Sequence, residues 1–327
     1  MAGNQKIDIS IVIVSFNTCD LTRRCLACVQ EHGGEVNREV IVVDNASADG
    51  SPEMIEQEFP EVTLIRLAVN KGFAGGNLPG MKQAKGRYIL LLNSDAFITA
   101  GVLSKTLAYM DANKRVGILG CRLTNPDGSL QPSARSLPGP INKFFHLSGL
   151  AARFPASPIF GKVDYTWWDH STPRKVGWVV GAFFMIRRRT MKEIGLLDDG
   201  YFLYFEEIDY CLAAHRKYWE VVFYPDASVV HLGGQSTLKT PGRISTHGRQ
   251  NLAIRIASEC RYYRKCYGLF RLLAAMGVEY TWNALVRLKH TLAPKKESPQ
   301  RKADARAVMG LIMEELLKPT KQKKPLA

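Results

Sequence analysis

Two aspartates of this sequence stand where strands are expected to end. Asp44 follows the apolar run Val40-Ile-Val-Val43, and Asp95 follows Leu90-Leu-Leu-Asn-Ser94. In open α/β sheets, ligands bind in the crevice beyond the carboxyl ends of the strands. Either aspartate alone is equally compatible with a helix cap, but both together favour one polar ligand, held with the help of a divalent metal ion.

A glycine-rich segment, Asn70-Lys-Gly-Phe-Ala-Gly-Gly-Asn77, lies between these two aspartates. Glycines allow a backbone to approach a ligand closely, and free amides at the start of a helix favour anions. The segment is not a Walker loop, because no Gly-Lys-Ser or Gly-Lys-Thr follows it, and its spacing does not fit the dinucleotide fingerprint. By itself this segment is a weak indication of a ligand.

Three carboxylates occupy the expected start of a helix in Phe205-Glu-Glu-Ile-Asp209, more than the helix dipole requires. Helical geometry puts Glu206 and Asp209 at neighbouring positions and turns Glu207 by about 100° from Glu206. A solvated acidic face is the simpler interpretation, but the aromatic residues of 201–205 argue against it. We expect one of these acids to accept a proton from a hydroxyl nucleophile, as a general base.

His231 closes a strand-like stretch around 221–231 and precedes Leu-Gly-Gly-Gln-Ser. A single histidine is more often structural than a metal ligand. At the end of a strand, in a chain with a candidate metal-binding aspartate, it becomes a second candidate ligand for a divalent ion.

Short β-branched runs alternate with helix-like segments from residue 8 to about residue 127. Near-continuous apolar strands between helices indicate a mostly parallel sheet covered on both faces, so we predict an α/β fold. Residues 126–174 are rich in Pro, Gly and Ser, and we expect a long loop or lid there. The expected strands cover 9–15, 39–44, 62–67 and 88–92, with a further strand over 176–187 and a helix over 206–217.

The chain has 327 residues, of which 46% are hydrophobic, and a net charge of +14. This composition excludes a mainly disordered, collagen-like or coiled-coil chain, and seven cysteines are too few for a disulfide scaffold. No signal peptide is visible, and charged residues interrupt the most apolar helical stretch, 268–288. We expect a soluble, cytoplasmic protein with a polyanionic neighbour.

The C-terminal third is helical in period and basic over 251–290, with Tyr, Phe and Trp between the Lys and Arg. Such a pattern suits peripheral attachment to an anionic membrane surface. A solvated helical appendage is the alternative. We expect no nucleic acid partner, because no recognition motif accompanies the charge.

Taken together and in this order, these pieces resemble the family 2 glycosyltransferases of the GT-A fold, a Rossmann-like, mostly parallel sheet with flanking helices. The resemblance covers about residues 9–236. The branch it is most similar to contains rhamnosyltransferases of bacterial surface polysaccharide and cell wall biosynthesis. The matching pieces are Ser10-Ile-Val-Ile-Val-Ser-Phe-Asn17, Val43-Asp-Asn-Ala-Ser-Ala-Asp-Gly-Ser51, the glycine-rich segment 70–77, Leu92-Asn-Ser-Asp95, Gly181-Ala182, Phe205-Glu-Glu-Ile-Asp209 and His231.

The resemblance implies the inverting transfer of one sugar from a nucleotide diphosphate donor to a hydroxyl of a glycan or lipid-linked acceptor. The usual donor of the branch is dTDP-rhamnose, and UDP-sugars are an alternative. The resemblance assigns a divalent metal, Mg or Mn, to Asp95 and His231, and the general base to Glu207, with Glu206 and Asp209 beside it for acceptor or sugar hydroxyls. It assigns nucleotide and donor binding to Ser15, Asn17, Asp44, Gly72, Phe73, Asn77, Asn93, Gly181 and Ala182.

Two positions depart from the family pattern. The first acid of the family's metal-binding Asp-x-Asp is Asn93 here, as is frequent in this branch. The base position often carries Asp, and Glu207 is one methylene longer, so the choice between Glu206 and Glu207 stays open. One alternative function is a non-catalytic nucleotide-sugar-binding or membrane-surface scaffold with a retained GT-A fold. A sugar nucleotidylyltransferase is a rival enzyme, but its basic, glycine-rich triphosphate loop is missing near the first strand.

We therefore expect three parts in the chain. A GT-A catalytic domain covers 1–240, a basic helical extension that contacts the membrane surface covers 241–292, and a flexible Lys/Arg-rich tail covers 293–327. The protein is expected in the cytoplasm, bound peripherally to the inner face of the cell membrane.

Overall fold

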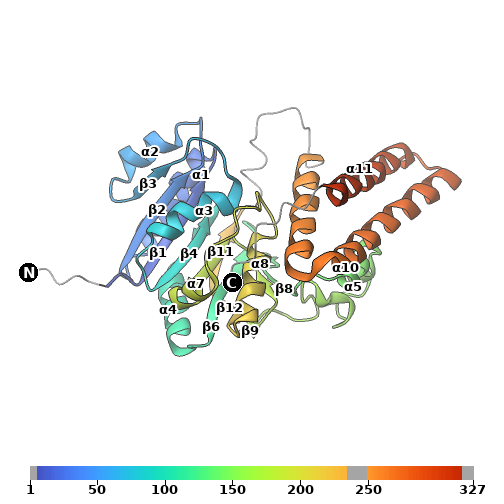
Figure 1. Ribbon diagram of the computed structural model, residues 1–327. Coiled ribbons are helices and arrows are strands. Elements are labelled where there is room, and N and C mark those ends of the chain that lie inside the picture. The colour runs from blue at the N-terminus through green and yellow to red at the C-terminus, as the bar shows by residue number, and fades with distance from the viewer. Residues whose placement is uncertain (1–5, 234–248, 319–327) are drawn as a thin grey trace, which may run out of the picture. The chain divides into compact units, whose positions relative to one another are not determined.

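The computed structural model describes residues 6–233 and 249–318 of the chain (Figure 1). The fold divides into two compact units. The first contains Met1–Leu137 and Pro155–Arg243, and the second contains Pro138–Phe154 and Ile244–Ala327. The expected domain boundary at residue 240 and the last motif residues, 234–236, lie outside the described residues.

The first unit is built on a sheet with strand order β3-β2-β1-β4-β11-β6-β12-β5. Strands β3, β2, β1 and β4 are parallel neighbours, whereas β11 runs antiparallel between β4 and β6. This mixed sheet with flanking helices confirms the predicted α/β fold. The strands are β1 (Ile9–Ser15), β2 (Arg38–Asp44), β3 (Thr63–Arg66), β4 (Tyr88–Asn93), β5 (Ala96–Ile98), β6 (Val116–Thr124), β7 (Leu130–Gln131), β8 (Ala134–Arg135), β9 (Arg174–Lys175), β10 (Trp178–Val179), β11 (Phe183–Arg187) and β12 (Glu220–His231).

Helices connect the parallel strands of the first unit, as the alternating pattern predicts. Pro52 at the first turn of α2 fits the start of that helix, because proline has no amide hydrogen to leave unpaired there. The helices of this unit are α1 (Cys19–His32), α2 (Ser51–Glu58), α3 (Gly72–Gln83), α4 (Val102–Ala112), α7 (Arg188–Ile194) and α8 (Glu206–Arg216), with a short 3-10 helix, η1 (Phe160–Lys162).

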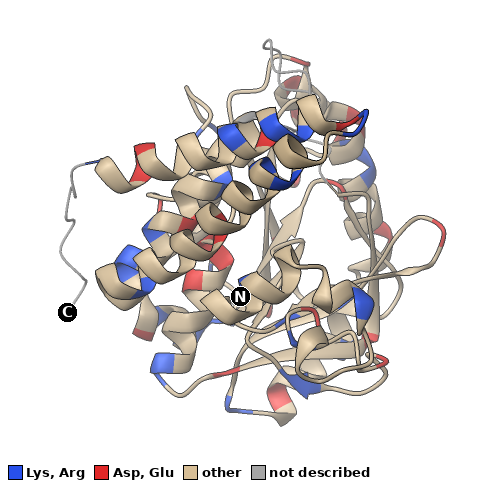
Figure 2. Ribbon diagram, turned by 90° about the vertical axis from the view of Figure 1, so that its right-hand side faces the viewer, with Lys and Arg blue, Asp and Glu red and all other residues tan. Residues whose placement is uncertain are grey.

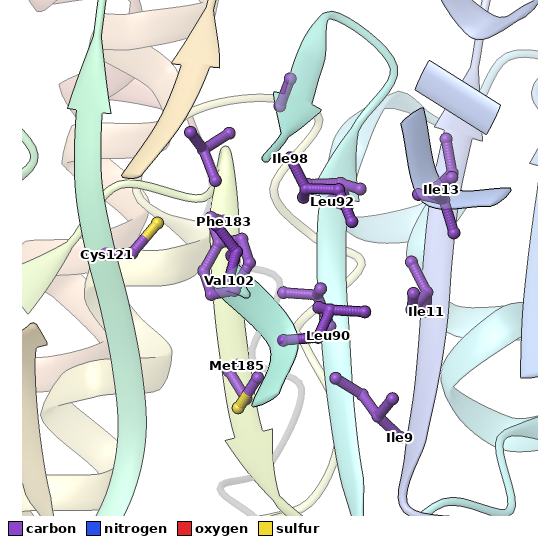
Figure 3. Close-up of a cluster of buried hydrophobic side chains, with 14 of the residues drawn as sticks. Ile9, Ile11, Ile13, Leu90, Leu92, Ile98, Val102, Cys121, Phe183 and Met185 are labelled. Atoms are coloured by element: carbon purple, nitrogen blue, oxygen red, sulfur yellow. The ribbon is translucent and has the colours of Figure 1, made fainter. Parts of the chain in front are cut away.

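Alternate residues of the central strands form the core of the first unit. Ile9, Ile11 and Ile13 of β1 are fully buried and point to the same side of the sheet as Leu90 and Leu92 of β4 (Figure 3). Side chains two apart on a strand share one face, so this period follows directly from the apolar runs in the sequence. The rigid core fixes the strand ends on which the candidate site depends.

Helix α3 contains most of the glycine-rich segment, and two of its glycines serve packing rather than ligand approach. A Cβ atom on Gly76 would lie 2.9 Å from Val14 Cγ1, and one on Gly80 would lie 2.4 Å from Val12 Cγ1. The helix therefore lies closer to β1 than any side chain at these positions would allow. Gly72, at the start of the helix, has a different role, described below.

The second unit is helical. Helix α10 (Arg249–Leu292) is interrupted at Gly268, whose φ of 80° and ψ of −176° divide it into two segments. The other helices are α5 (Pro140–Leu147), α6 (Leu150–Arg153) and α11 (Ser298–Leu317), and α10 packs against both α5 and α11. Among the helices that the structure describes, none combines the length and apolar character needed to span a bilayer.

A buried ionic cluster holds α5 against both segments of α10. Lys143 Nζ lies 2.7 Å from Glu259 Oε1 and 2.5 Å from Glu279 Oε2, and Arg255 contacts the second oxygen of each carboxylate at 2.9 Å and 2.5 Å. Burial by itself would raise the pKa of Glu279, but Lys143 and Arg255 more than offset this and lower it. Two cations and two anions thus compensate one another inside the unit.

The second unit differs from the expected basic extension and tail in two respects. Residues 138–154, expected in the loop or lid of the catalytic domain, belong to this helical unit. Helix α11 occupies Ser298–Leu317, in the stretch for which the sequence favours a flexible tail. Burial of Ala305 and Ile312, with α11 packed on α10, explains the helix better than local sequence does.

Candidate active site

A cavity of about 430 Å³ opens beside the end of β2. Asp44, the last residue of that strand, is buried, and its Oδ2 accepts a hydrogen bond from the amide of Ser47 at 3.0 Å. Its other oxygen, Oδ1, is buried and has no hydrogen-bond partner in the described chain. A buried carboxylate oxygen without a partner is costly, so this atom is suited to accept a hydrogen bond from a ligand. The cavity is lined by Asp44, Ala46, Ser47, Ala48, Gly50, Pro52, Glu53, Arg66 and Leu67.

Asn17 shapes the wall of this cavity instead of lining it. Its side-chain oxygen accepts a hydrogen bond from the amide of Ala48 at 2.8 Å, and its own amide donates to Ser47 Oγ at 3.0 Å. Ser15 is fully buried, and its hydroxyl lies 2.9 Å from that of Thr22. Asn17 thus holds the loop that lines the cavity, whereas the Ser15 hydroxyl contacts helix α1.

Two residues fix the start of α3. One is Gly72, which has a left-handed backbone conformation, and the other is Asn45, to which the sequence analysis gave no role. Gly72 has a φ of 70°, and a Cβ there would lie 1.9 Å from the carbonyl oxygen of Phe202. That oxygen accepts a hydrogen bond from the amide of Phe73 at 2.8 Å. Asn45 Nδ2 donates to the Gly72 carbonyl at 3.0 Å, and Asn45 Oδ1 accepts from the amide of Lys71 at 2.8 Å. The start of α3 is therefore joined both to the end of β2 and to the loop before α8.

Phe73 brings the start of α3 next to the loop between β10 and β11. A Cβ on Gly181 would lie 3.2 Å from the Phe73 ring, so a larger residue there would press on it. Asn77 is buried, and its amide nitrogen donates to the Phe73 carbonyl at 2.9 Å within the helix. The carbonyl of Ala182 accepts a hydrogen bond from the amide of Asn93 at 3.1 Å. Five of the predicted donor-binding residues are thus linked, Phe73 with Gly181 and Asn77, and Asn93 with Ala182.

Asp95 and His231, 136 residues apart in the sequence, meet at the edge of the sheet. Both side chains are buried, and His231 Nε2 lies 3.3 Å from Asp95 Oδ1. Strand β12 brings them together because it pairs with β5, opposite residues 96–98. Asn93 Nδ2 lies 3.4 Å from the same ring nitrogen. The proximity of these three side chains agrees with the prediction of a shared ligand.

Gln131 fixes the proton on the His231 ring. Its side-chain oxygen lies 2.6 Å from His231 Nδ1, and its nitrogen donates to Asn125 Oδ1 at 3.1 Å. Because a carboxamide oxygen only accepts, Nδ1 donates to Gln131, and Nε2 is the ring nitrogen that faces Asp95. Nε2 and the Asp95 oxygen point at each other, an arrangement suited to a cation between them.

A divalent ion would find two protein ligands here. Within the described ranges, no group of three or more His, Cys, Asp or Glu side chains could hold a metal ion. An ion bound by Asp95 and His231 would therefore take its remaining ligands from water and from the substrate, as Mg²⁺ does in many phosphate-binding sites.

Glu206 and Glu207 open helix α8 after a strained turn. Tyr204 and Phe205 both have left-handed backbone conformations, with φ of 68° and 71°. Glu206 is buried and Glu207 half-buried, and in the part of the chain that is described neither Oε2 has a hydrogen-bond partner. Asp209, one turn further, is also buried. The left-handed turn is the kind of local strain that persists where the surrounding structure enforces it.

Burial decides the protonation of the two glutamates. It raises the pKa of Glu207 to about 7, against the opposing effects of backbone hydrogen bonds and of Arg135. Burial, together with the neighbouring Glu207 charge, raises the pKa of Glu206 well above its ordinary value. Burial thus favours the protonated form of both acids, and at neutral pH Glu207 can hold or release a proton. A carboxylate with a pKa near the operating pH is suited to general-base work.

Arg135 is a second residue that sequence analysis did not single out. It lies in β8, pairs with Asp164 at 3.1 Å, and stacks 5.5 Å from the Trp178 ring centroid. Its positive charge acts on Glu207. No local motif contains Arg135 or Gln131, and the motif that contains Asn45 does not indicate its contacts with Lys71 and Gly72, because each of the three acts on a residue distant in sequence.

Comparisons with known proteins agree with the motifs and with this arrangement. The model of glycosyl transferase family 2 matches residues 10–213. The N-acetylglucosaminyl-diphospho-decaprenol L-rhamnosyltransferase of Mycobacterium tuberculosis is 29% identical over 213 residues, which are 62% of this chain and 69% of that protein. The low-salt glycan biosynthesis hexosyltransferase Agl10 of Haloferax volcanii is 25% identical over 214 residues, 64% of this chain and 62% of that protein.

Two solved structures share the fold at low sequence identity. The mannosyltransferase PcManGT from Pyrobaculum calidifontis, in complex with GDP-Man and Mn2+, has a TM-score of 0.52 at 14% identity and covers 96% of this chain and 88% of that one. GalNAc-T7 with UDP, GalNAc and Mn2+ has a TM-score of 0.58 at 15% identity. The match covers 96% of this chain and 57% of that one. At such low sequence identity, the likeness establishes the fold alone. That shared fold confirms the predicted GT-A-like architecture.

Proposed function

Because this chain belongs to glycosyl transferase family 2, we propose that it transfers a sugar, with inversion, from a nucleotide diphosphate donor to a hydroxyl of a glycan or lipid-linked acceptor. Rhamnose from dTDP-rhamnose is the proposed donor group. It is supported by the rhamnosyltransferase among the relatives, at 29% identity. The product would serve cell-surface polysaccharide synthesis, and glycan biosynthesis is the process named for the relative from Haloferax volcanii.

The nucleoside of the donor would occupy the cavity beside Asp44. The free Oδ1 of Asp44 would accept a hydrogen bond from the base or ribose, while Asn17 and Ser47 hold the loop. The remaining predicted donor-binding residues would lie along the donor or support the loops around it. These are Ser15, Gly72, Phe73, Asn77, Asn93, Gly181 and Ala182.

Asp95 and His231 would hold a divalent ion, Mg or Mn. His231 Nε2 and the Asp95 carboxylate fit such an ion, and Mn2+ accompanies the nucleotide or nucleotide sugar in the two solved structures. When bound, a divalent ion neutralises the negative charge that develops on a leaving diphosphate. Gln131 keeps the His231 ring oriented, with Nε2 toward Asp95.

Glu207 would be the general base of the reaction. Its ionised carboxylate would take the proton of the acceptor hydroxyl as the oxygen attacks the anomeric carbon from the face opposite the diphosphate. One displacement of this kind inverts the configuration. Glu206, whose pKa is raised by burial, and Asp209 would hold acceptor or sugar hydroxyls beside it.

One observation carries the proposal of an enzyme over that of a binding scaffold. Among the described residues, the buried Oε2 of Glu207 has no hydrogen-bond partner, and burial raises the pKa of Glu207 to about 7. A scaffold gains nothing from such an acid, because burying it without a partner costs stability.

The proposal is tested by calorimetric binding of a panel of nucleotide sugars, with and without Mn2+, to the wild-type chain and to Asp95→Ala. We expect one nucleotide sugar to bind with metal, and Asp95→Ala to abolish this. The matched control is Asp20→Ala, because Asp20 is an exposed aspartate of α1. Binding without turnover on any acceptor, unchanged by Glu207→Gln, would instead support the scaffold. No binding of any nucleotide sugar would refute the assignment of the site.

We also propose that the protein attaches peripherally to the inner face of the cell membrane. Fourteen Lys and Arg stand against six Asp and Glu over residues 249–318, so this region carries more than half of the net charge of the chain. A lipid-linked acceptor of the kind named for the mycobacterial relative would lie at such a surface.

A further inference from the structure

A groove of about 740 Å³ lies between the second segment of α10 and helix α11, both in the second unit. Three cations line it: Arg287 from α10 and Lys302 and Arg306 from α11. Its floor is small and apolar, with Ala307 and Gly310 among the lining residues. A hollow of this size with converging positive charge is suited to an anionic group.

The three cations are not neutralised by the protein. Over residues 6–233 and 249–318, neither Arg287, Lys302 nor Arg306 forms an ion pair with a carboxylate. Glu314 is the acidic residue among the groove's lining, and Lys318 Nζ lies 3.8 Å from it. This contrasts with the ionic cluster around Lys143 in the same unit, where charges are matched. The cations of the groove are therefore available to a ligand.

Exposed apolar side chains accompany this charge. The second unit holds less than a third of the chain, yet it carries eleven of the seventeen large apolar side chains that are exposed among the described residues. Next in sequence to the lining residues Arg287 and Thr291, Leu288 and Leu292 of α10 are 53% and 76% exposed, and Leu317, the last residue of α11, is 76% exposed. Lys and Arg as well as Asp and Glu positions are distributed along both helices (Figure 2).

The aromatic residues expected at a membrane surface contribute less than the sequence suggests. Tyr262 and Tyr263, in the first segment of α10, are fully buried. Phe270, just after the kink, is exposed. The apolar part of the surface is therefore formed mainly by leucines that no local aromatic pattern marks.

We propose that the groove binds the phosphate of an anionic lipid headgroup, with the leucines beside it entering the interfacial layer. Charge complementarity favours a phosphate, and the exposed leucines favour one that belongs to a bilayer over one that is free in solution. This inference rests on the membrane attachment proposed above and assigns it to particular residues.

The test is flotation of the full-length protein with phosphatidylcholine vesicles that contain or lack phosphatidylglycerol. The groove variant carries Arg287→Gln, Lys302→Gln and Arg306→Gln. Its matched control is Lys295→Gln, Lys296→Gln and Arg301→Gln, which removes the same charge from exposed positions of the same unit outside the groove. Each cation at an anionic surface strengthens binding about fivefold, so we expect the groove variant to bind on the order of 100-fold more weakly and the control much less so.

Several outcomes would overturn the inference. Equal losses in the two triple variants would show that binding depends on diffuse charge and not on the groove. Wild-type protein that ignores phosphatidylglycerol vesicles would refute both the groove and the membrane attachment. If inorganic phosphate, or an oligonucleotide, binds the groove and vesicles do not, the ligand is not a lipid. A Leu288→Gln, Leu292→Gln double variant should also float poorly, with the cations intact.

Failure of the groove is distinguishable from failure of the proposed sugar transfer. None of the substituted residues belongs to the candidate active site. Nucleotide-sugar binding in the presence of Mn2+, measured on the same variants, is therefore expected to match the wild type. If the groove variant loses vesicle binding but still binds the nucleotide sugar, the result supports the groove as the lipid site. If the groove variant still binds vesicles, the groove proposal is refuted.

Discussion

Replacing Glu207 with glutamine should lower activity and raise stability at the same time. Its pKa of about 7 lies roughly 2.5 units above the ordinary value of 4.5 because the carboxylate is buried without a partner. At about 1.36 kcal/mol per unit, the folded chain loses up to about 3 kcal/mol when this group ionises. Glutamine keeps the shape and removes the charge.

The sign of the pH dependence follows from the same shift. Between about pH 4.5 and pH 7 the folded chain holds a proton on Glu207 that the unfolded chain has released, so stability falls as pH rises through this window. Above pH 7 Glu207 is ionised in the folded chain, and the folded chain then bears the full stability cost of that buried charge. Glu207→Gln should therefore be more stable than wild type at pH 8 and nearly equal to it at pH 4.

Activity should change in the opposite direction. Release of the nucleotide diphosphate is measured with the donor identified by binding. The wild-type kcat/KM should fall tenfold per pH unit below an apparent pKa near 7, because the base must be ionised. Glu207→Gln should lose about 10²- to 10⁴-fold in kcat, with little change in KM for the donor, and the acid limb should disappear.

Glu206→Gln is the matched control. Because burial and the neighbouring Glu207 charge raise the pKa of Glu206 and so favour its protonated form, an amide resembles that form, and the acid limb near pH 7 should remain. The reasoning is refuted if Glu207→Gln keeps most of its activity, or if it gains no stability at pH 8. If the acid limb disappears with Glu206→Gln instead, the roles of the two glutamates are exchanged.

Three further predictions concern residues that support the site or the second unit. Gln131→Leu removes the acceptor that fixes the His231 tautomer, so calorimetry should show Mn2+ affinity about 10- to 100-fold weaker; unchanged affinity would argue against a metal on that histidine. Gly72→Ala forces a Cβ against a backbone carbonyl 1.9 Å away and should cost more stability in urea unfolding than Gly128→Ala, which has a φ of 82° and no neighbour within 4 Å. Lys143→Met leaves two buried glutamates with one cation and should destabilise the chain by about 3 kcal/mol in thermal unfolding. Lys105→Met, at an exposed position, should not destabilise the chain. Similar melting temperatures of these two variants would contradict a stabilising role of the ionic cluster.

The sequence alone determined the sheet, the strand ends and the family. Apolar runs that alternate with helical segments specify parallel strands, and the residue after each run is then placed at the carboxyl edge of the sheet. This is why Asp44 and Asp95 could be predicted at that edge. Seven short motifs in one order added the family, which the comparison over residues 10–213 confirms. These features depend on local pattern, and local pattern is visible in a sequence.

Only the tertiary structure decided which distant side chains act on one another. Gln131 meets His231 across 100 residues, and Asn45 holds the start of α3, although neither position carries a sequence signal for that role. The pKa of Glu207 follows from burial, and burial depends on all the elements packed around α8. Likewise, cations of a solvated helix and cations of a groove look alike in sequence. The difference arises only when α11 folds back on α10 and leaves three of those cations without acidic partners among the described residues.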